Sequence, residues 1–163
     1  ADLYTDEANA AALRAGGADG DLASWLKAHL ARSQSGDYVA LLGYVARDKT
    51  TIDALQRMRR AVLEKRHVAT AAEFGPRFLH STGQAYKGGP NSGVFLQITS
   101  DDAVDLQVPG QKYTFGVVKA AQARGDFQVL LERNRRALRV HLGADVGAGL
   151  KTLQGAVTAA LEG

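Results

Sequence analysis

The stretch that organises the predicted fold runs from residue 74 to residue 99 and reads FGPRFLHSTGQAYKGGPNSG, then VFLQIT. Its first part holds five of the 18 glycines and two of the three prolines, a composition typical of a loop. Its second part is almost wholly apolar and predicts a strand buried on both faces. Open α/β sheets bind their ligands in loops at strand ends. We therefore predict that residues 74–93 form the functional loop.

Outward from this loop, strands alternate with helical patterns. Residues 38–45 read YVALLGYV, a continuous apolar run that predicts another buried strand. Shorter strands are predicted at 3–4, 67–71 and 137–142. In the last of these, Leu138, Val140 and Leu142 alternate with Arg139 and His141, which indicates an edge strand with one exposed face.

Apolar residues at helical spacing predict the intervening helices. A short helix capped by Thr5 or Asp6 is expected to end near residue 14, and one starting at Asp21 near residue 33. The longest is capped by Thr50 or Thr51 and ends near residue 65. Three more helices are predicted. One spans 113–124, one begins at the cap Asp126 after a break at Gly125, and one spans 145–161. Alternating strands and helices predict one α/β domain over residues 1–163, with three α-β-α layers and a mostly parallel sheet of about five strands.

Composition excludes several classes of protein. The chain has no cysteine, which rules out disulfides, thiolate metal sites and a cysteine nucleophile. No apolar run is long enough for a membrane helix and no secretory signal is visible, so we expect a cytoplasmic protein without membrane contact. Two basic clusters, at 57–66 and 133–139, have no interleaved aromatic residues, so solvated helix faces are favoured over nucleic-acid binding. His29 is expected on a helix surface or partly buried.

Side chains of the functional loop suit a phosphorylated polyol. Ser81, Thr82 and Gln84 offer hydroxyl and amide groups, and Gly83 allows close backbone approach. Arg77 and Lys87 bracket this run with positive charge that would hold a phosphate. The loop lacks a P-loop lysine, and no histidine pair has metal-ligand spacing. A polar surface loop without any ligand would have a similar composition, so both interpretations stay open on these grounds.

The run from residue 75 to 99, followed by PGQKYTFG at 109–116 and AAQARGD at 120–126, resembles the C-terminal end of bifunctional transaldolase/glucose-6-phosphate isomerase proteins. The resemblance covers essentially the whole chain and is most specific over residues 75–126. It implies a sugar isomerase fold and identifies the chain as the second of two isomerase subdomains that follow a transaldolase barrel. The start at Ala1 fits a segment of a longer chain, and N-terminal processing would explain the missing methionine equally well.

The resemblance implies interconversion of glucose 6-phosphate and fructose 6-phosphate through an enediolate, with a carboxylate as the usual base and no cofactor. Gly83 and Gln84 match a Gly-Gln pair of the family, but residues 78–80 occupy the place of the glutamate that precedes it. Glu73 and His80 are therefore the candidate bases. Lys87 is preferred as the cation over Lys112 or Lys119 because it shares the loop. The expected substrate-binding residues are Arg77, Ser81, Thr82, Gly83 and Gln84.

By the same resemblance, the phosphate pocket belongs to the first isomerase subdomain. We expect the isolated segment to fold with little or no isomerase activity, and the parent chain to form a dimer. A non-catalytic domain that binds a sugar phosphate and regulates or docks to a partner is the alternative from another functional class. A nucleic-acid binder using the basic clusters is the third.

Overall fold

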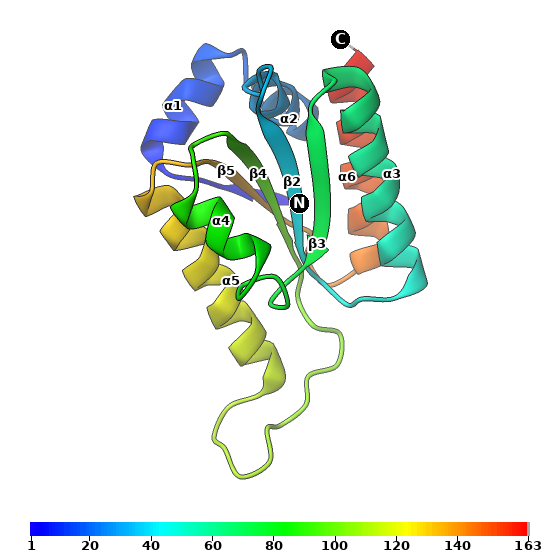
Figure 1. The fold of residues 1–163 in the computed structure, drawn as a ribbon. Helices are drawn as coiled ribbons and strands as arrows, with labels where there is room; N and C mark the ends of the chain where they lie inside the picture. Colours follow the sequence, from blue (N-terminus) through cyan, green and yellow to red (C-terminus); the bar gives the residue numbers. More distant parts are fainter. Residues whose placement is uncertain (163) are drawn as a thin grey trace.

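Five strands form a single sheet in the computed structural model, which describes residues 1–162 (Figure 1). Their order is β1-β5-β4-β2-β3. Strands β5, β4, β2 and β3 run parallel to one another, and β1 pairs antiparallel with β5. The strands are β1 (Asp2–Tyr4), β2 (Tyr38–Tyr44), β3 (Ala69–Phe74), β4 (Gly93–Thr99) and β5 (Arg136–His141). The prediction of a mostly parallel sheet of about five strands is confirmed.

Helices cover both faces of the sheet, giving the predicted three layers (Figure 1). One face packs on α1 (Glu7–Ala15), α2 (Leu22–Ala31), α3 (Lys49–Arg66) and α6 (Val146–Glu162). The other packs on α4 (Thr82–Gly88) and α5 (Phe115–Glu132). The interior strand β2 serves both layers, because Val39 and Leu41 point to the first and Ala40 and Leu42 to the second. Its unbroken apolar run is thereby explained.

Two predicted boundaries are corrected. Asp48, rather than Thr50 or Thr51, caps α3, because its Oδ1 accepts the backbone N–H of Thr51 at 2.8 Å. The third strand begins at Ala69 rather than His67. His67 instead takes a left-handed conformation (φ 54°) that ends α3.

The predicted break at Gly125 is wrong, because α5 runs unbroken from Phe115 to Glu132. A single glycine inside a helix costs only about 1 kcal/mol relative to alanine, and Ala123, Phe127 and Leu130 bury one continuous stripe across it. Asp126 is therefore a buried mid-helix residue and caps nothing. The functional loop is also more ordered than predicted, since residues 82–88 form α4.

The prediction that the strand at 137–142 lies at an edge of the sheet is wrong, because β5 lies between β4 and β1. Arg139 and His141 lie on the face of the sheet that α5 covers, instead of facing open solvent. His29 is wholly buried, not on a helix surface, and its Nε2 lies 2.9 Å from the carbonyl oxygen of Phe95. None of the helices in residues 1–162 combines the length and the apolar character that crossing a bilayer requires.

Candidate functional site

The carboxyl ends of the parallel strands meet at one edge of the sheet. Tyr44 pairs with Thr99, and Thr99 pairs with His141, so these three residues form a row along that edge. The chain leaves β2 to form β3 on one side and then β4 on the other, which makes the junction of β2 and β4 a topological switch point. Ligands of open α/β sheets bind at such points. Several hollows open near this edge, and two of them are described below.

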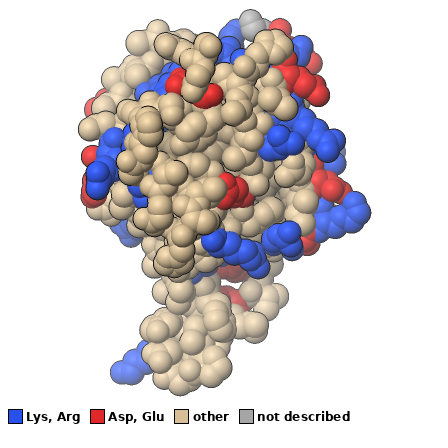
Figure 2. Space-filling model, viewed as in Figure 1, with Lys and Arg blue, Asp and Glu red and all other residues tan. Residues whose placement is uncertain are grey.

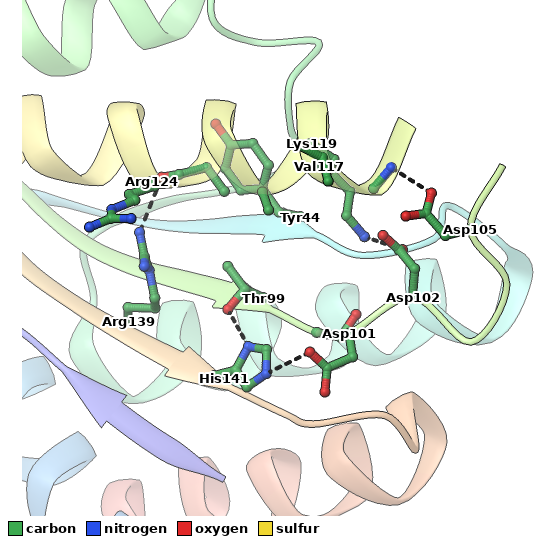
Figure 3. Close-up of a pocket in the computed structure, with 14 residues that line it drawn as sticks. Tyr44, Thr99, Asp101, Asp102, Asp105, Val117, Lys119, Arg124, Arg139 and His141 are labelled. Carbon is green, nitrogen blue, oxygen red and sulfur yellow. Dashed lines mark hydrogen bonds and ion pairs between the residues drawn. The ribbon is translucent and has the colours of Figure 1, made fainter. Parts of the chain in front are cut away.

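The larger hollow, here named the β4–β5 cleft, lies between the ends of these strands, the segment after β4 and the first half of α5 (Figure 3). Its volume of about 530 Å³ is in the range of small-molecule sites. Its titratable lining residues are Tyr44, Asp101, Asp102, Asp105, Lys119, Arg124, Arg139 and His141. The cleft therefore combines acid, base and cationic groups.

His141 forms the floor of the cleft. Its Nδ1 lies 3.0 Å from the hydroxyl of Thr99, and its Nε2 lies 3.4 Å from Oδ1 of Asp101. The side chain is 26% exposed, so the ring is open to a ligand while both nitrogens have partners. This arrangement can exchange a proton with a bound hydroxyl group.

Acidic residues gather at the outer end of the cleft. Lys119 forms an ion pair with Asp102, and Asp105 accepts the backbone N–H of Gly116 at 2.7 Å. A Cβ atom at Gly116 would come within 2.6 Å of carboxylate oxygens of both Asp102 and Asp105. Only glycine allows both carboxylates to approach the helix backbone this closely.

Arg139 lies at the inner end of the cleft. Its Nε donates to Oε1 of Gln97 at 2.7 Å, and its Nη2 donates to the carbonyl of Ala123 at 3.2 Å. The guanidinium carbon lies 4.5 Å from the centre of the Phe127 ring. Gln97 is fully buried and itself donates to Ala123. Burial lowers the pKa of Arg139, and the neighbouring charge of Arg124 lowers it further.

The smaller hollow, of about 380 Å³, is lined in part by Glu73 at the end of β3 and is named the Glu73 hollow. Arg77 and Ser81 line it together with Arg47 and Gln56. The Glu73 carboxylate accepts hydrogen bonds from the hydroxyls of Thr82, at 2.5 Å, and of Tyr86. Burial raises the pKa of Tyr86, and its bond to Glu73 adds to the effect, so the phenol remains a donor. The structure therefore brings together four of the residues predicted from the sequence: Glu73, Arg77, Ser81 and Thr82.

The other predicted site residues lie elsewhere. His80 is exposed and lies outside the lining of the Glu73 hollow. Gly83 is buried, and a Cβ there would lie 2.8 Å from the carbonyl oxygen of Phe78, which accounts for the glycine by packing alone. The amide of Gln84 turns back to donate to Leu79 at 2.5 Å. Lys87 pairs at 2.5 Å with buried Asp126, which also accepts from the hydroxyl of Tyr44 at 3.1 Å.

Sequence reasoning missed the β4–β5 cleft. The alternation in residues 137–142 correctly placed Arg139 and His141 on one face, but this face was expected to be exposed. Two features of the tertiary structure were missing: β1 pairs outside β5, and α5 packs over this face. Asp101 lies two residues after the end of a predicted strand, and this position was the one local signal for the cleft.

Comparison with known proteins shows the fold alone. No family model matches the chain, and no curated protein matches it. Among solved structures, the chain is similar to the hypothetical protein TT0462 of Thermus thermophilus, with a TM-score of 0.72 and 14% sequence identity. The match covers 95% of this chain and 44% of that one. The match thus spans less than half the length of this structurally similar protein.

Proposed function

We propose that this chain is one subdomain of an aldose–ketose isomerase that interconverts glucose 6-phosphate and fructose 6-phosphate. The observation that supports this proposal is the Glu73 hollow, which Glu73, at the end of a parallel strand, lines together with two arginines and a serine. Abstraction of a proton next to a carbonyl needs a base and a nearby positive charge for the developing oxyanion. The hollow contains both.

In this proposal, Glu73 takes a proton from the carbon next to the carbonyl and returns it to the neighbouring carbon. Arg47 and Arg77 stabilise the enediolate oxygen, and Ser81 binds a sugar hydroxyl. The hydroxyls of Thr82 and Tyr86 hold the carboxylate in place from the α4 side. Glu73 is preferred to His80 as the base because it lines the hollow and His80 does not.

The proposal includes a first isomerase subdomain that supplies the phosphate pocket, in a parent chain that also carries a transaldolase domain and acts as a cytoplasmic dimer. The chain of 163 residues alone is then expected to show little or no turnover in an assay coupled to glucose-6-phosphate oxidation. Full turnover by this chain alone would contradict the division of the site between two subdomains.

The catalytic test is Glu73→Gln in the active parent protein, with Glu132→Gln as the matched control at an exposed position on α5. Loss of a general base lowers kcat by about 100-fold or more while KM changes little, since the amide keeps the shape of the side chain. His80→Ala is expected to leave most activity. Unchanged kcat in Glu73→Gln would overturn the assignment of the base.

A non-catalytic sugar-phosphate-binding domain is the second candidate. The observation in its favour is that Glu73 already accepts two hydrogen bonds that tie β3 to α4, which is also what a purely structural carboxylate does. Under this alternative, the parent protein has no isomerase activity. In that case Glu73→Gln weakens the binding of fructose 6-phosphate measured by calorimetry.

A further inference from the structure

The inner end of the β4–β5 cleft has an excess of positive charge. Arg124 and Arg139 lie beside each other there, as Figure 3 shows. Across residues 1–162, no carboxylate comes within ion-pair distance of either guanidinium. The partners of Arg139 are neutral: an amide oxygen, a carbonyl oxygen and an aromatic ring. The nearest buried carboxylate, Asp126, is paired with Lys87 instead. Two adjacent cations without a direct ion-pair partner favour a bound anion.

Arg139 is held in one orientation. Its Nε donates to the side chain of Gln97, which is 0% exposed, and its Nη2 donates to the carbonyl of Ala123. The Phe127 ring supports the guanidinium plane. With these groups fixed, the remaining N–H donors need little ordering when an anion arrives, and this preorganisation favours binding.

The rest of the cleft has the opposite character. Asp101, Asp102 and Asp105 lie toward its outer end, where they repel an anion. His141 and Thr99 lie on the floor between the two ends, where they can exchange hydrogen bonds with hydroxyl groups. The arrangement of charge therefore orients an elongated ligand with its anionic group at the arginines and its hydroxyl groups at the histidine and the carboxylates.

We infer that the β4–β5 cleft binds a small phosphate monoester of a polyol, with the phosphate on Arg124 and Arg139 and the hydroxyl groups on His141 and Asp101. The volume of about 530 Å³ accommodates a molecule of this class. The cleft shares no lining residue with the Glu73 hollow. The site is therefore separate from the proposed isomerase site, and it does not rest on the proposed function.

Calorimetric titration of the 163-residue chain tests the site with three probes: sn-glycerol 3-phosphate, inorganic phosphate and glycerol. The expected order of affinity is the order in which they are named, because only the first has both the anion and the hydroxyl groups. Arg124→Gln is expected to weaken binding of glycerol 3-phosphate about tenfold by removing one charge-assisted contact. Arg133→Gln removes the same charge from the exposed end of the same helix and is expected to leave the dissociation constant unchanged.

Arg139→Lys provides a second variant that keeps the charge in the buried network but loses the planar fork, and it is expected to bind more weakly than the wild type. Equal weakening by the Arg124 and Arg133 variants would overturn the site, as would failure of all probes to bind. Equal affinity for phosphate and the monoester would overturn the role of His141 and Asp101. Glu73→Gln should bind glycerol 3-phosphate normally even if it lacks isomerase activity. Loss of binding in that variant would place the ligand in the other hollow instead.

Discussion

His29 shows how a single buried histidine links stability to pH. Its ring is wholly buried, Nε2 faces the Phe95 carbonyl, and Nδ1 has no hydrogen-bond partner. Burial lowers its pKa to about 3, and the nearby charges of Arg32 and Arg136 act in the same direction. The carbonyl requires a donor, so Nε2 carries the proton of the neutral ring.

Between pH 6.5 and about 3, the unfolded chain binds a proton at His29 that the folded protein does not. The free energy of unfolding is therefore expected to fall by about 1.4 kcal/mol for each pH unit below 6.5, and to be fully retained above it. Urea unfolding at pH 7, 6 and 5 measures the slope. Subtracting the slope of His29→Gln removes the contribution of other groups, and identical slopes would show that the ring is protonated in the folded state.

Lys87 and Asp126 form an ion pair whose side chains are 19% and 2% exposed. Lys87→Met leaves the Asp126 charge buried with only the Tyr44 hydroxyl as partner, so we expect a loss of about 3 kcal/mol in unfolding free energy. Adding Asp126→Asn should restore much of this loss because it removes the isolated charge. Lys119→Met, at a more exposed pair, is expected to cost less than about 1 kcal/mol. Equal losses for the two lysines would contradict the role of burial.

Individual site residues differed in how well they could be predicted. Glu73 was found because it follows a predicted strand and is the lone carboxylate between residues 67 and 97. Its partner Tyr86 was not, since a tyrosine in a glycine-rich loop gives no sign of which side chain it reaches. Lys87 was expected beside the substrate, but Asp126, 39 positions later, pairs with it through the packing of α4 on α5. Such partners depend on tertiary structure and leave no local signal.

Helix caps provide a local test of the fold. Asp48→Ala removes the side-chain acceptor of the Thr51 N–H at the start of α3, and we expect a loss of about 1 kcal/mol in unfolding free energy. Thr50→Ala, at the exposed neighbouring position first considered as the cap, serves as the control and should change stability by less than about 0.5 kcal/mol. Thermal or urea unfolding measures both. A larger effect at Thr50 would assign the cap to the threonine.

Elements were predicted well where burial is continuous and less well where local signals compete. Strands β2 and β4 were predicted within one residue because their apolar runs are buried on both faces. Gly125 was given too much weight as a helix breaker, since the buried stripe of α5 overrides it. The short α4 was missed because its seven residues include two glycines and no recognisable apolar face.

The segment from residue 100 to 114 extends away from the body of the molecule (Figure 1). In the view of Figure 2 the projecting lobe is mostly uncharged. Val104 and Leu106 are 78% and 64% exposed, and Lys112 lies on the same segment. Among the residues described, this segment has no helix, and its bridge from Gln107 to Thr114 is an isolated one.

Trypsin is therefore expected to cut first after Lys112, because an exposed segment outside the packed layers fits the protease site most readily. One fragment ends at residue 112 and the other starts at residue 113. They should stay associated, because β4 in the first fragment pairs with β5 in the second. Mass spectrometry after brief digestion identifies the site, and size exclusion tests the association. Lys112→Gln should remove the first cut, whereas early cutting in α3 would contradict the expectation.

The pairing of β1 with β5 also has a consequence for the order of folding. Asp2 pairs with His141, so β1 cannot pair until β5, the last strand of the sheet, has been synthesised. Strands β2, β3 and β4 join through much shorter connections, and loop-closure entropy favours their assembly first. Until β5 is made, the outer edge of β4 stays unpaired, and the nascent chain is then most open to strand pairing with other molecules. Docking of β5 and β1 removes that hazard and, in the same step, brings Arg139 and His141 to the cleft.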